Sequence, residues 1–143
     1  MNKKTSKLNL SQLQINVTQN CGTEKPFDNE YWNNKEDGIY VDIISGDPLF
    51  CSLHKYDSGT GWPSFYDIIK ESNISEHKDL TLGYERIELK CKKSKSHLGH
   101  KFEDGPNDNS RYCINSASLK FIPINELEDK GYGQLMYLFE NNK

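Results

Sequence analysis

The stretch that decides the fold reads RYCINSASLKFIP and occupies residues 111–123. Successive side chains of a β-strand point to opposite faces, so in an extended chain the odd-numbered residues of this stretch share one face. That face is apolar toward its C-terminal end but carries Arg111, Cys113 and Asn115 at its start. Because buried polar groups need partners, the pattern predicts a strand that joins a core at one end and borders a polar site at the other.

Cys113 is the most reactive residue of this strand. A guanidinium beside a thiol favours the thiolate, and an amide can donate a hydrogen bond to it, so Arg111 and Asn115 give Cys113 a reason to ionise. The alternative is a buried, inert cysteine, which is the usual state of a free thiol in a protein core. The stretch alone leaves both interpretations open.

Three further short strands are predicted before this stretch, in addition to the strand that the stretch itself forms. β-Branched and aromatic residues, alternating polarity and flanking turn residues are the signals. The strands are expected at residues 38–44, 81–93, 97–103 and 111–124. Several short strands with small helices at the ends indicate a mainly β, α+β domain.

Short helices are expected near both ends of the chain and in the middle. The N-terminal helix follows a capping box formed by Ser11 and Gln14. The helices are expected at residues 12–17, 62–70 and within 125–143. We interpret residues 1–143 as a single domain, of which residues 1–17 form a polar extension with a short helix.

The composition excludes several classes of protein. The chain has 143 residues, 34% of them hydrophobic and 27% charged, which suits one domain with its own core. A net charge of −3 and a pI near 5.8 offer no basic surface for nucleic acid or an anionic membrane. No apolar run is long enough to span a membrane, and no signal-peptide core follows the basic residues 1–4. We expect a soluble, cytoplasmic monomer that binds neither nucleic acid nor membrane.

The four cysteines allow several kinds of chemistry. They are Cys21, Cys51, Cys91 and Cys113, and no two of them form a Cys-x-x-Cys pair. Two disulfides are possible in a secreted chain, whereas a cytoplasmic chain keeps its thiols reduced, for metal binding, redox chemistry or packing. A metal site made of Cys91, His97, His100 and Cys113 has spacings that match no common zinc signature.

Two histidines precede the decisive stretch, in the segment HLGH at residues 97–100. On a regular strand the imidazoles of His97 and His100 would face opposite sides, so both can reach one site only if the chain bends at Gly99. Either ring could then act as an acid, a base or a partner of a thiolate. The alternative is a pair of partly exposed histidines on an edge strand.

Trp62 follows a glycine-rich turn in the segment SGTGWPSF at residues 58–65. Gly59 and Gly61 let the backbone turn sharply, and Pro63 holds Trp62 in the extended region. This arrangement suits one wall of a small apolar pocket. A core tryptophan that happens to follow a turn fits equally well.

Together these segments resemble the methionine-R-sulfoxide reductase B family, in content and in order, from about residue 18 to residue 123. The matching segments are GTEKPF at 22–27, EYWN at 30–33, GIYV at 38–41, GTGWPSF at 59–65, HLGHKFEDGP at 97–106 and RYCINSA at 111–117. The resemblance implies twisted antiparallel sheets of the β-tent type. It also implies reduction of the R epimer of methionine sulfoxide, mainly in peptides and proteins and with the free amino acid as an alternative substrate, and thioredoxin as the reductant.

The resemblance also implies a role for each polar residue around the thiol. Cys113 falls on the family's nucleophile, and Trp62 falls on the aromatic wall that holds the substrate methyl group. Thr23 and Glu24 are expected, from the resemblance, to bind the substrate as well. The other polar positions of the site are His97, His100, Asp104, Arg111 and Asn115.

The chemistry of sulfoxide reduction agrees with these assignments. A sulfoxide sulfur becomes electrophilic when its oxygen is protonated, so the site needs a thiolate, an acid and an apolar pocket. We predict that Cys113 attacks sulfur while His97 or His100 supplies the proton, which leaves a sulfenic acid on Cys113. Arg111 is expected to stabilise the thiolate, Asp104 to orient a histidine, and Asn115 to anchor a ring or the substrate.

The chain departs from the family pattern at two places. Many members hold a structural zinc ion with two Cys-x-x-Cys pairs, whose positions are here Asp42, Ser45, Cys91 and Ser94, so we expect no metal and no other cofactor. Many members also carry a resolving cysteine where this chain has Thr60. Cys21 is then the candidate resolving thiol, an external thiol is the alternative, and Cys51 is expected to be a small core residue.

Two other functions fit parts of the pattern. A cysteine hydrolase could use Cys113, a histidine and Asp104, and it would cleave esters or amides without any dithiol. A non-catalytic binding module is possible because a fold does not fix a function. That interpretation gives no reason for a thiol, a guanidinium, an amide and two imidazoles to occur together.

Overall fold

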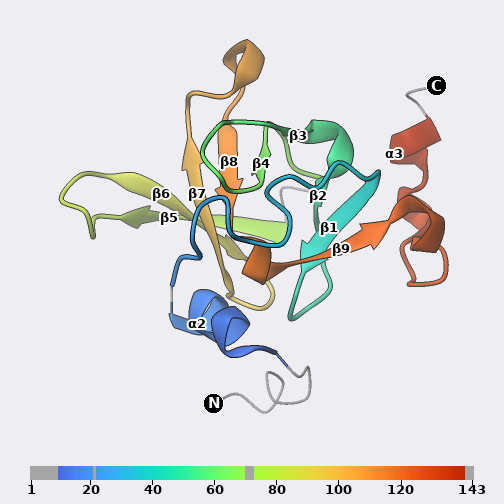
Figure 1. The fold of residues 1–143 in the computed structure, drawn as a ribbon, viewed down its shortest axis with the longest axis horizontal. Helices are drawn as coiled ribbons and strands as arrows, with labels where there is room; N and C mark the ends of the chain where they lie inside the picture. Colours follow the sequence, from blue (N-terminus) through green and yellow to red (C-terminus); the bar gives the residue numbers. More distant parts are fainter. Residues whose placement is uncertain (1–9, 21, 70–72, 141–143) are drawn as a thin grey trace.

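The computed structural model describes residues 10–20, 22–69 and 73–140, and these form two antiparallel sheets with short helices at the periphery (Figure 1). The smaller sheet has the order β2-β1-β9, with β1 Gly38–Asp42, β2 Pro48–Cys51 and β9 Leu119–Pro123. The larger sheet has the order β3-β4-β8-β7-β6-β5, with β3 Lys55–Tyr56, β4 Ser64–Phe65, β5 Ile74–Asp79, β6 Arg86–Cys91, β7 His97–Phe102 and β8 Arg111–Ile114. The prediction of a mainly β fold is confirmed.

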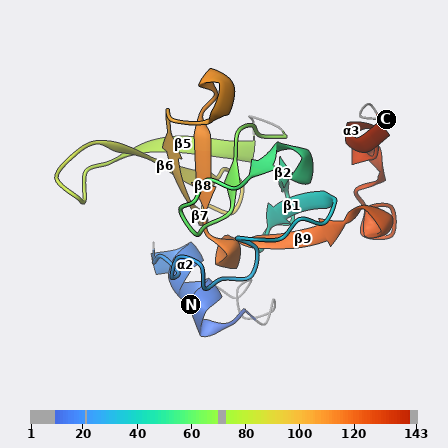
Figure 2. The same ribbon diagram turned by 45° about the horizontal axis from the view of Figure 1, so that its top comes forward.

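The helices of the described residues are short. They comprise the α-helices α2 Gln12–Asn20 and α3 Tyr137–Glu140 and the 3₁₀ helices η1 Ser52–His54, η3 Pro106–Asp108, η4 Ser116–Ser118, η5 Ile124–Glu126 and η6 Gly133–Leu135. Helix α2 packs against η4 and β7 at the edge of the molecule (Figure 2). Within the described residues, no helix is both long enough and apolar enough to cross a bilayer.

Helix α2 begins as the sequence predicts. The Ser11 backbone N–H donates to Gln14 Oε1 at 2.8 Å, and the Gln14 N–H donates to Ser11 Oγ at 3.1 Å, which is the reciprocal pair of a capping box. The helix continues to Asn20, three residues beyond the expected end, and it buries Val17 completely. The expected helix at 12–17 is therefore confirmed, with a longer C-terminal end.

The expected strand at 111–124 is broken in the middle, and its two halves belong to different sheets. Strand β8 ends at Ile114, η4 turns the chain, and β9 enters the smaller sheet. The cause is Glu24, a distant residue whose carboxylate accepts hydrogen bonds from the Ser116 and Ala117 backbone N–H groups. These N–H groups are thereby withdrawn from strand pairing, so the odd-numbered residues of the stretch share a face only within β8.

Two other predicted elements were wrong in kind or extent. The helix expected at 62–70 is replaced by β4, because the larger sheet pairs this segment with β3 on one side and with β8 on the other. The strand expected at 81–93 begins only at Arg86, because the chain before it turns through Gly83, whose φ is +82°. Its partner β5 was not predicted, because the polar sequence ISEHKD lacks the apolar alternation of a half-buried strand.

The main core lies where the two sheets face each other. Tyr40 and Phe50 of the smaller sheet are fully buried against Phe65 of the larger one, and the Phe50 and Phe65 rings stack with centroids 4.5 Å apart. Each such side chain contributes roughly 1.5–3 kcal/mol when it is buried. A second cluster covers the other side of the smaller sheet and contains Cys51, which is fully buried as the sequence predicted. This packing fixes β8 in the larger sheet, with Cys113 on it.

Candidate active site

Cys113 lies in the middle of the larger sheet, between two polar neighbours. Ser64 of β4 is its direct partner on one side, and His100 of β7 is its direct partner on the other. Residues directly opposite each other in antiparallel strands have their side chains on one face, with Cβ atoms about 4.5–5.5 Å apart. The sheet therefore places an imidazole and a hydroxyl on either side of the thiol.

His97 and His100 lie on the same side of β7 because the strand contains a β-bulge. Leu89 of β6 pairs with Gly99, whereas the next residue, Lys90, pairs with His97, so Leu98 is an extra residue in the ladder. The extra residue cancels the alternation between the two histidines, and their ring centroids are 5.6 Å apart. The bend that the sequence required at Gly99 is thus provided by the bulge.

Gly99 is also required by the close approach of β8. A Cβ atom on Gly99 would lie 2.0 Å from the carbonyl oxygen of Cys113, a distance at which no side chain can be accommodated. The absence of a side chain at position 99 lets β7 and β8 pair closely beside the nucleophile candidate. The glycine therefore sets the distance between His100 and Cys113.

Two carboxylates from neighbouring strands hold the histidines, and the sequence analysis missed both. Glu88 Oε2 of β6 lies 2.7 Å from His97 Nδ1, and Asp79 Oδ2 at the end of β5 lies 2.7 Å from His100 Nε2. Arg86 donates to the same Asp79 oxygen at 3.1 Å. The alternation of Arg86 and Glu88 with apolar residues along β6 could have indicated a polar face there. Asp79 could not have been found, because its strand was not predicted.

The two histidines differ in burial and in the carboxylate that each contacts. His97 is 3% exposed, and this burial lowers its pKa, although the contact with Glu88 opposes the shift. Asp79 has a pKa well below its usual range because it accepts hydrogen bonds from the Thr81 N–H and hydroxyl group and pairs with His100. His97 is therefore a neutral, buried ring, whereas His100 is paired with an ionised carboxylate.

Asp104 pairs with Arg111 and not with a histidine. Arg111 Nε donates to Asp104 Oδ1 at 2.8 Å, and Nη2 donates to Oδ2 at 3.3 Å, while the guanidinium lies over the Phe102 ring at 4.3 Å. The expectation that Asp104 orients a histidine was wrong, since the orienting carboxylates are Glu88 and Asp79. Asp104 instead fixes Arg111, which lies two residues before Cys113 on the same face of β8.

Opposing influences act on the Cys113 thiol. Burial raises its pKa above the ordinary value, while the Arg111 charge and a hydrogen bond with the Thr60 side chain act in the opposite direction. The Thr60 hydroxyl is itself 2.7 Å from Ser58 Oγ, which is 2.7 Å from Ser64 Oγ. Arg111 therefore favours the thiolate as expected, but the resting site is dominated by burial and holds the thiol form.

A small cavity of about 120 Å³ opens over the thiol. Its lining includes Thr23, Trp62, His100, Phe102, Cys113 and Asn115. The Trp62 indole is fixed because its Nε1 donates to the Glu24 carbonyl oxygen at 3.0 Å. A cavity of this size admits the end of one side chain, whereas pockets for whole drug-sized ligands are several times larger. Trp62 thus forms a wall of a pocket, as the sequence suggested.

Glu24 and Asn115 hold the walls of the cavity in place. The Glu24 side chain is buried and bonded to backbone N–H groups, so it supports the site from behind and does not face a substrate. Asn115 accepts from the Glu24 N–H at 3.2 Å and donates to the Leu98 carbonyl at 3.2 Å. It therefore joins the 22–24 segment to β7 and anchors the backbone rather than an imidazole ring.

The four positions that hold zinc in many family members lie on two turns and do not fit a zinc ion here. Ser45 Oγ is 3.6 Å from Cys91 Sγ, Asp42 Oδ2 accepts the Ser45 N–H at 2.8 Å, and Ser94 Oγ donates to Ser96 Oγ at 2.8 Å. One thiol, one carboxylate and two hydroxyls are a poor donor set for zinc, which prefers thiolate and imidazole. Among the described residues, no group of three or more His, Cys, Asp or Glu could hold a metal.

The other described cysteines are remote from this chemistry. Cys51 and Cys91 are buried and free, and both belong to apolar clusters. Cys21, the candidate resolving thiol, lies outside the described residues. The structure therefore brings together Cys113, His97, His100, Arg111, Asp104, Asn115 and Trp62, and it adds Asp79 and Glu88.

Comparison with known proteins shows a family that the chain matches and a similar protein of known name. A family model described as "SelR domain" matches residues 10–123. The chain is similar to a protein of Vibrio cholerae serotype O1 named peptide methionine sulfoxide reductase MsrA/MsrB, with 54% identity over 132 residues, which is 92% of this chain and 35% of that relative. The chain thus spans about a third of the length of this relative.

Proposed function

The chain belongs to the SelR family, the methionine-R-sulfoxide reductase B family, and from this premise we propose that it reduces the R epimer of methionine sulfoxide with Cys113 as the nucleophile. The observation that carries the proposal is a single thiol, directly opposite His100, at the base of a side-chain-sized cavity walled by Trp62. Peptide-bound methionine sulfoxide is the proposed substrate, with the free amino acid as a second possibility.

The first step moves one oxygen atom from the substrate to the enzyme. The Cys113 thiolate attacks the sulfoxide sulfur, a proton reaches the sulfoxide oxygen, and the sulfur–oxygen bond of the substrate breaks as one forms on Cys113. Methionine sulfoxide is thereby reduced by two electrons to methionine. The Cys113 thiol is oxidised by two electrons to a sulfenic acid.

We assign the proton transfer to His100 and a positioning role to His97. His100 lines the cavity with Cys113, and Asp79, which is ionised, can stabilise a positive charge on its ring. His97 is buried, and its lowered pKa keeps it neutral, which suits a ring that packs against His100. His100 can take the thiol proton as Cys113 ionises and deliver it to the sulfoxide oxygen.

The geometry of the cavity supports a choice between epimers. The sulfoxide sulfur carries an oxygen atom, a methyl group and the rest of the side chain. With the sulfur facing Cys113 and the oxygen near His100, the two epimers exchange the positions of the methyl group and the rest of the side chain. Trp62 is fixed through its indole N–H, so the methyl group has one apolar surface to contact. Only one epimer can then direct its oxygen toward His100 while its sulfur faces Cys113.

Regeneration of the thiol requires an external reductant. Thioredoxin is the proposed reductant, by attack on the sulfenic acid or on a disulfide between Cys113 and Cys21. A cytoplasmic location is proposed with it, because thiols such as Cys51, Cys91 and Cys113 stay reduced there. We further propose that the protein acts as a monomer. It is also proposed to need no metal, because the four positions that hold zinc in many family members carry a single thiol here.

Steady-state turnover of a peptide with racemic methionine sulfoxide, in excess dithiothreitol, tests the proposal. Chromatographic separation of the epimers should show loss of the R epimer alone, and Cys113→Ser should abolish it. Cleavage of ester or amide substrates without dithiol would instead support the cysteine hydrolase. Persistence of both epimers with the wild-type protein would refute the reductase.

A further inference from the structure

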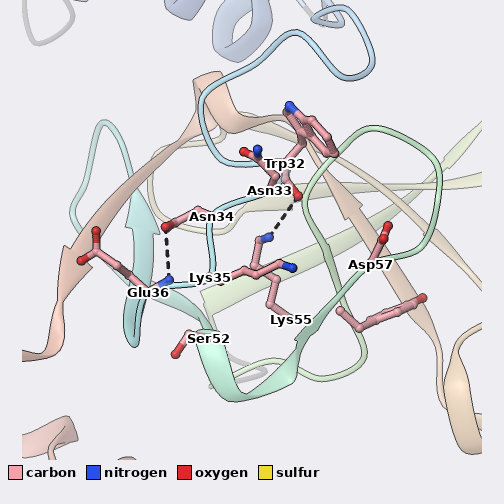
Figure 3. A pocket seen from close by; sticks show the side chains of 9 residues that line it. Trp32, Asn33, Asn34, Lys35, Glu36, Ser52, Lys55 and Asp57 are labelled. Atoms are coloured by element: carbon pink, nitrogen blue, oxygen red, sulfur yellow. Dashed lines mark hydrogen bonds between the residues drawn. The ribbon is translucent and has the colours of Figure 1, made fainter.

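A second cavity, open to solvent, lies away from the Trp62 wall and has no role in the first step. It has a volume of about 490 Å³, shares no lining residue with the cavity over Cys113, and lies beside η1 and β3 (Figure 3). The lining residues that matter are Trp32, Lys35, Glu36, Lys55, Tyr56 and Asp57. We call it the lysine cavity. Its volume is that of a typical small-molecule site.

Two ammonium groups share this cavity. Figure 3 shows the Lys35 and Lys55 side chains directed into it, with Lys55 Nζ donating to the Trp32 carbonyl oxygen at 3.1 Å. Burial lowers the pKa of Lys55, the positive charge of Lys35 lowers it further, and Asp57 opposes the shift. Neither lysine forms an ion pair within the described part of the chain. The negative charge of a carboxylate bound between the two lysines would offset both the cost of burying the Lys55 ammonium group and its repulsion by Lys35.

The rim of the lysine cavity carries the opposite charge. Glu36 and Asp57 line it together with the two lysines, so the site offers two cations and two anions at close range. A ligand with both carboxylate and ammonium groups complements such a surface, whereas a ligand of one charge would meet repulsion. Trp32, whose ring packs edge-on against Phe27 at 5.0 Å, supplies an apolar wall.

A shallow groove adjoins the lysine cavity. Tyr56 and Asp57 line both the lysine cavity and this groove, and the groove is also lined by Thr60 and Arg111, whose side chains contact Cys113. Tyr56 pairs with Ser64, and Ser64 pairs with Cys113, so all three lie in one row across the sheet. With strands about 4.8 Å apart, the Tyr56 and Cys113 backbones are about 10 Å apart.

The direction of attack on a sulfenic acid favours this groove as the route of the reducing thiol. The oxygen on Cys113 comes from a substrate on the Trp62 and His100 side, so the new sulfur–oxygen bond points to that side. Displacement at sulfur proceeds in line, with the incoming thiol opposite the leaving oxygen. His100 flanks Cys113 from β7 and Ser64 flanks it from β4. Thr60 is joined to Ser64 through Ser58 and lines the groove, so the groove approaches Cys113 from the β4 side.

We propose that the lysine cavity binds the carboxylate-bearing body of a small zwitterionic thiol, whose sulfur reaches Cys113 along the groove. This inference rests on the proposed function and adds a second reductant site to it. The first thiol forms a sulfur–sulfur bond with Cys113 while the sulfenic oxygen leaves as water, its protons coming from the sulfenic acid and the thiol. A second thiol molecule then displaces Cys113, so two thiols become one disulfide and Cys113 regains its thiol.

The experiment separates the second half-reaction from the first. Cys113 is converted to the sulfenic acid with one equivalent of R-sulfoxide peptide and is then mixed with reduced glutathione, as a zwitterionic thiol, or with 2-mercaptoethanol, as an uncharged one. The measured quantity is the ratio of the two second-order rate constants. Lys35→Gln and Lys55→Gln should each lower this ratio about tenfold. Lys120→Gln, a substitution of an exposed lysine of β9, should leave it at the wild-type value.

A binding measurement gives a readout that does not depend on turnover. S-Methylglutathione should bind Cys113→Ser, and adding Lys35→Gln should weaken this binding about tenfold. Unchanged ratios and unchanged binding in both lysine variants would overturn the inference. A rise in KM for the sulfoxide peptide, or slower reduction by thioredoxin with the ratio unchanged, would assign the cavity to the substrate or to a protein and would also overturn it. A wild-type protein that forms no methionine from the R-sulfoxide peptide contradicts the proposed function itself.

Discussion

Glu24→Gln tests how the site is held together, because Glu24 contacts three parts of it, two through its carboxylate and one through its backbone oxygen. The Glu24 side chain accepts hydrogen bonds from the Ser116 and Ala117 N–H groups, and the Glu24 backbone oxygen holds the Trp62 indole. The amide of the variant has one acceptor oxygen, so one buried N–H group would keep a weaker bond. The other would face the NH₂ group of the glutamine.

The magnitude follows from these two bonds. Hydrogen bonds to charged groups contribute about 1.5–3 kcal/mol each, and a buried N–H without a partner costs about 1–3 kcal/mol. Burial raises the pKa of Glu24, so removing the buried charge returns part of this loss. We expect a net decrease of about 2 kcal/mol in the free energy of unfolding, which lowers Tm by about 4–8 °C for a chain of this size.

Guanidinium denaturation and thermal unfolding measure this change, with Glu126→Gln, on exposed η5, as the matched control. The Glu24 backbone oxygen still accepts from the Trp62 indole, but the backbone is less firmly anchored once the carboxylate bonds weaken, so KM for the sulfoxide peptide should rise more than kcat falls. A Glu24→Gln protein as stable as the control, within about 0.5 kcal/mol, would show that the carboxylate does not cause the break between β8 and β9. A fall in kcat alone would show that Glu24 acts on the chemistry and not on the wall.

Three further predictions concern the strands around the thiol. Gly99→Ala should lower the free energy of unfolding by about 3 kcal/mol or more, because the new Cβ would lie 2.0 Å from the Cys113 carbonyl oxygen. The control Gly133→Ala, whose Cβ would have no atom nearer than 3.6 Å, should change it by less than about 1 kcal/mol. Equal effects of the two substitutions in denaturant titrations would contradict the close approach of β7 and β8. The pKa of Asp79 is lowered on folding, so its stabilisation is present above about pH 4 and is lost as the pH falls below that value. The stability difference between wild type and Asp79→Asn should therefore shrink in acid, and a constant difference from pH 7 to pH 3 would argue against the ionised pair. Thr60→Cys should form a disulfide with Cys113 after one turnover, detected as the loss of two thiols in a thiol titration; loss of a single thiol would show that position 60 is out of reach.

Local patterns predicted the elements whose stability is local. The capping box of Ser11 and Gln14 specifies the start of α2 through bonds between neighbours in sequence. The strand at Gly38–Asp42 and the strand at His97–Phe102 carry enough alternation and β-branched or aromatic residues to be recognised. Local patterns did not predict the ends of elements that are set by hydrogen bonds from residues distant in the sequence. Glu24 interrupts the strand at Ser116 from 92 positions away, and no pattern within 111–123 reveals it.

The site was predictable as a set of residues but not as a set of partners. Motif content and order indicated Cys113, His97, His100, Arg111, Asp104, Asn115 and Trp62. The partners depend on strand register, and the β-bulge at Leu98 changes which side chains meet. Asp79 and Glu88 therefore became visible only when β5 and β6 were placed beside β7. In the folded chain Asp104 pairs with Arg111. The histidines His97 and His100 pair with Glu88 and Asp79 instead.

The most direct test of the central claim is a single turnover without any reductant. One equivalent of peptide with R-methionine sulfoxide, and separately one equivalent with the S epimer, is added to the protein, and methionine and the state of Cys113 are measured by mass spectrometry with a sulfenic acid trap. We predict one methionine per chain and modification of Cys113 with the R epimer, and neither with the S epimer. Formation of methionine from R-sulfoxide by Cys113→Ser, or equal reaction of both epimers, would contradict the assignment of Cys113 and of the Trp62 wall.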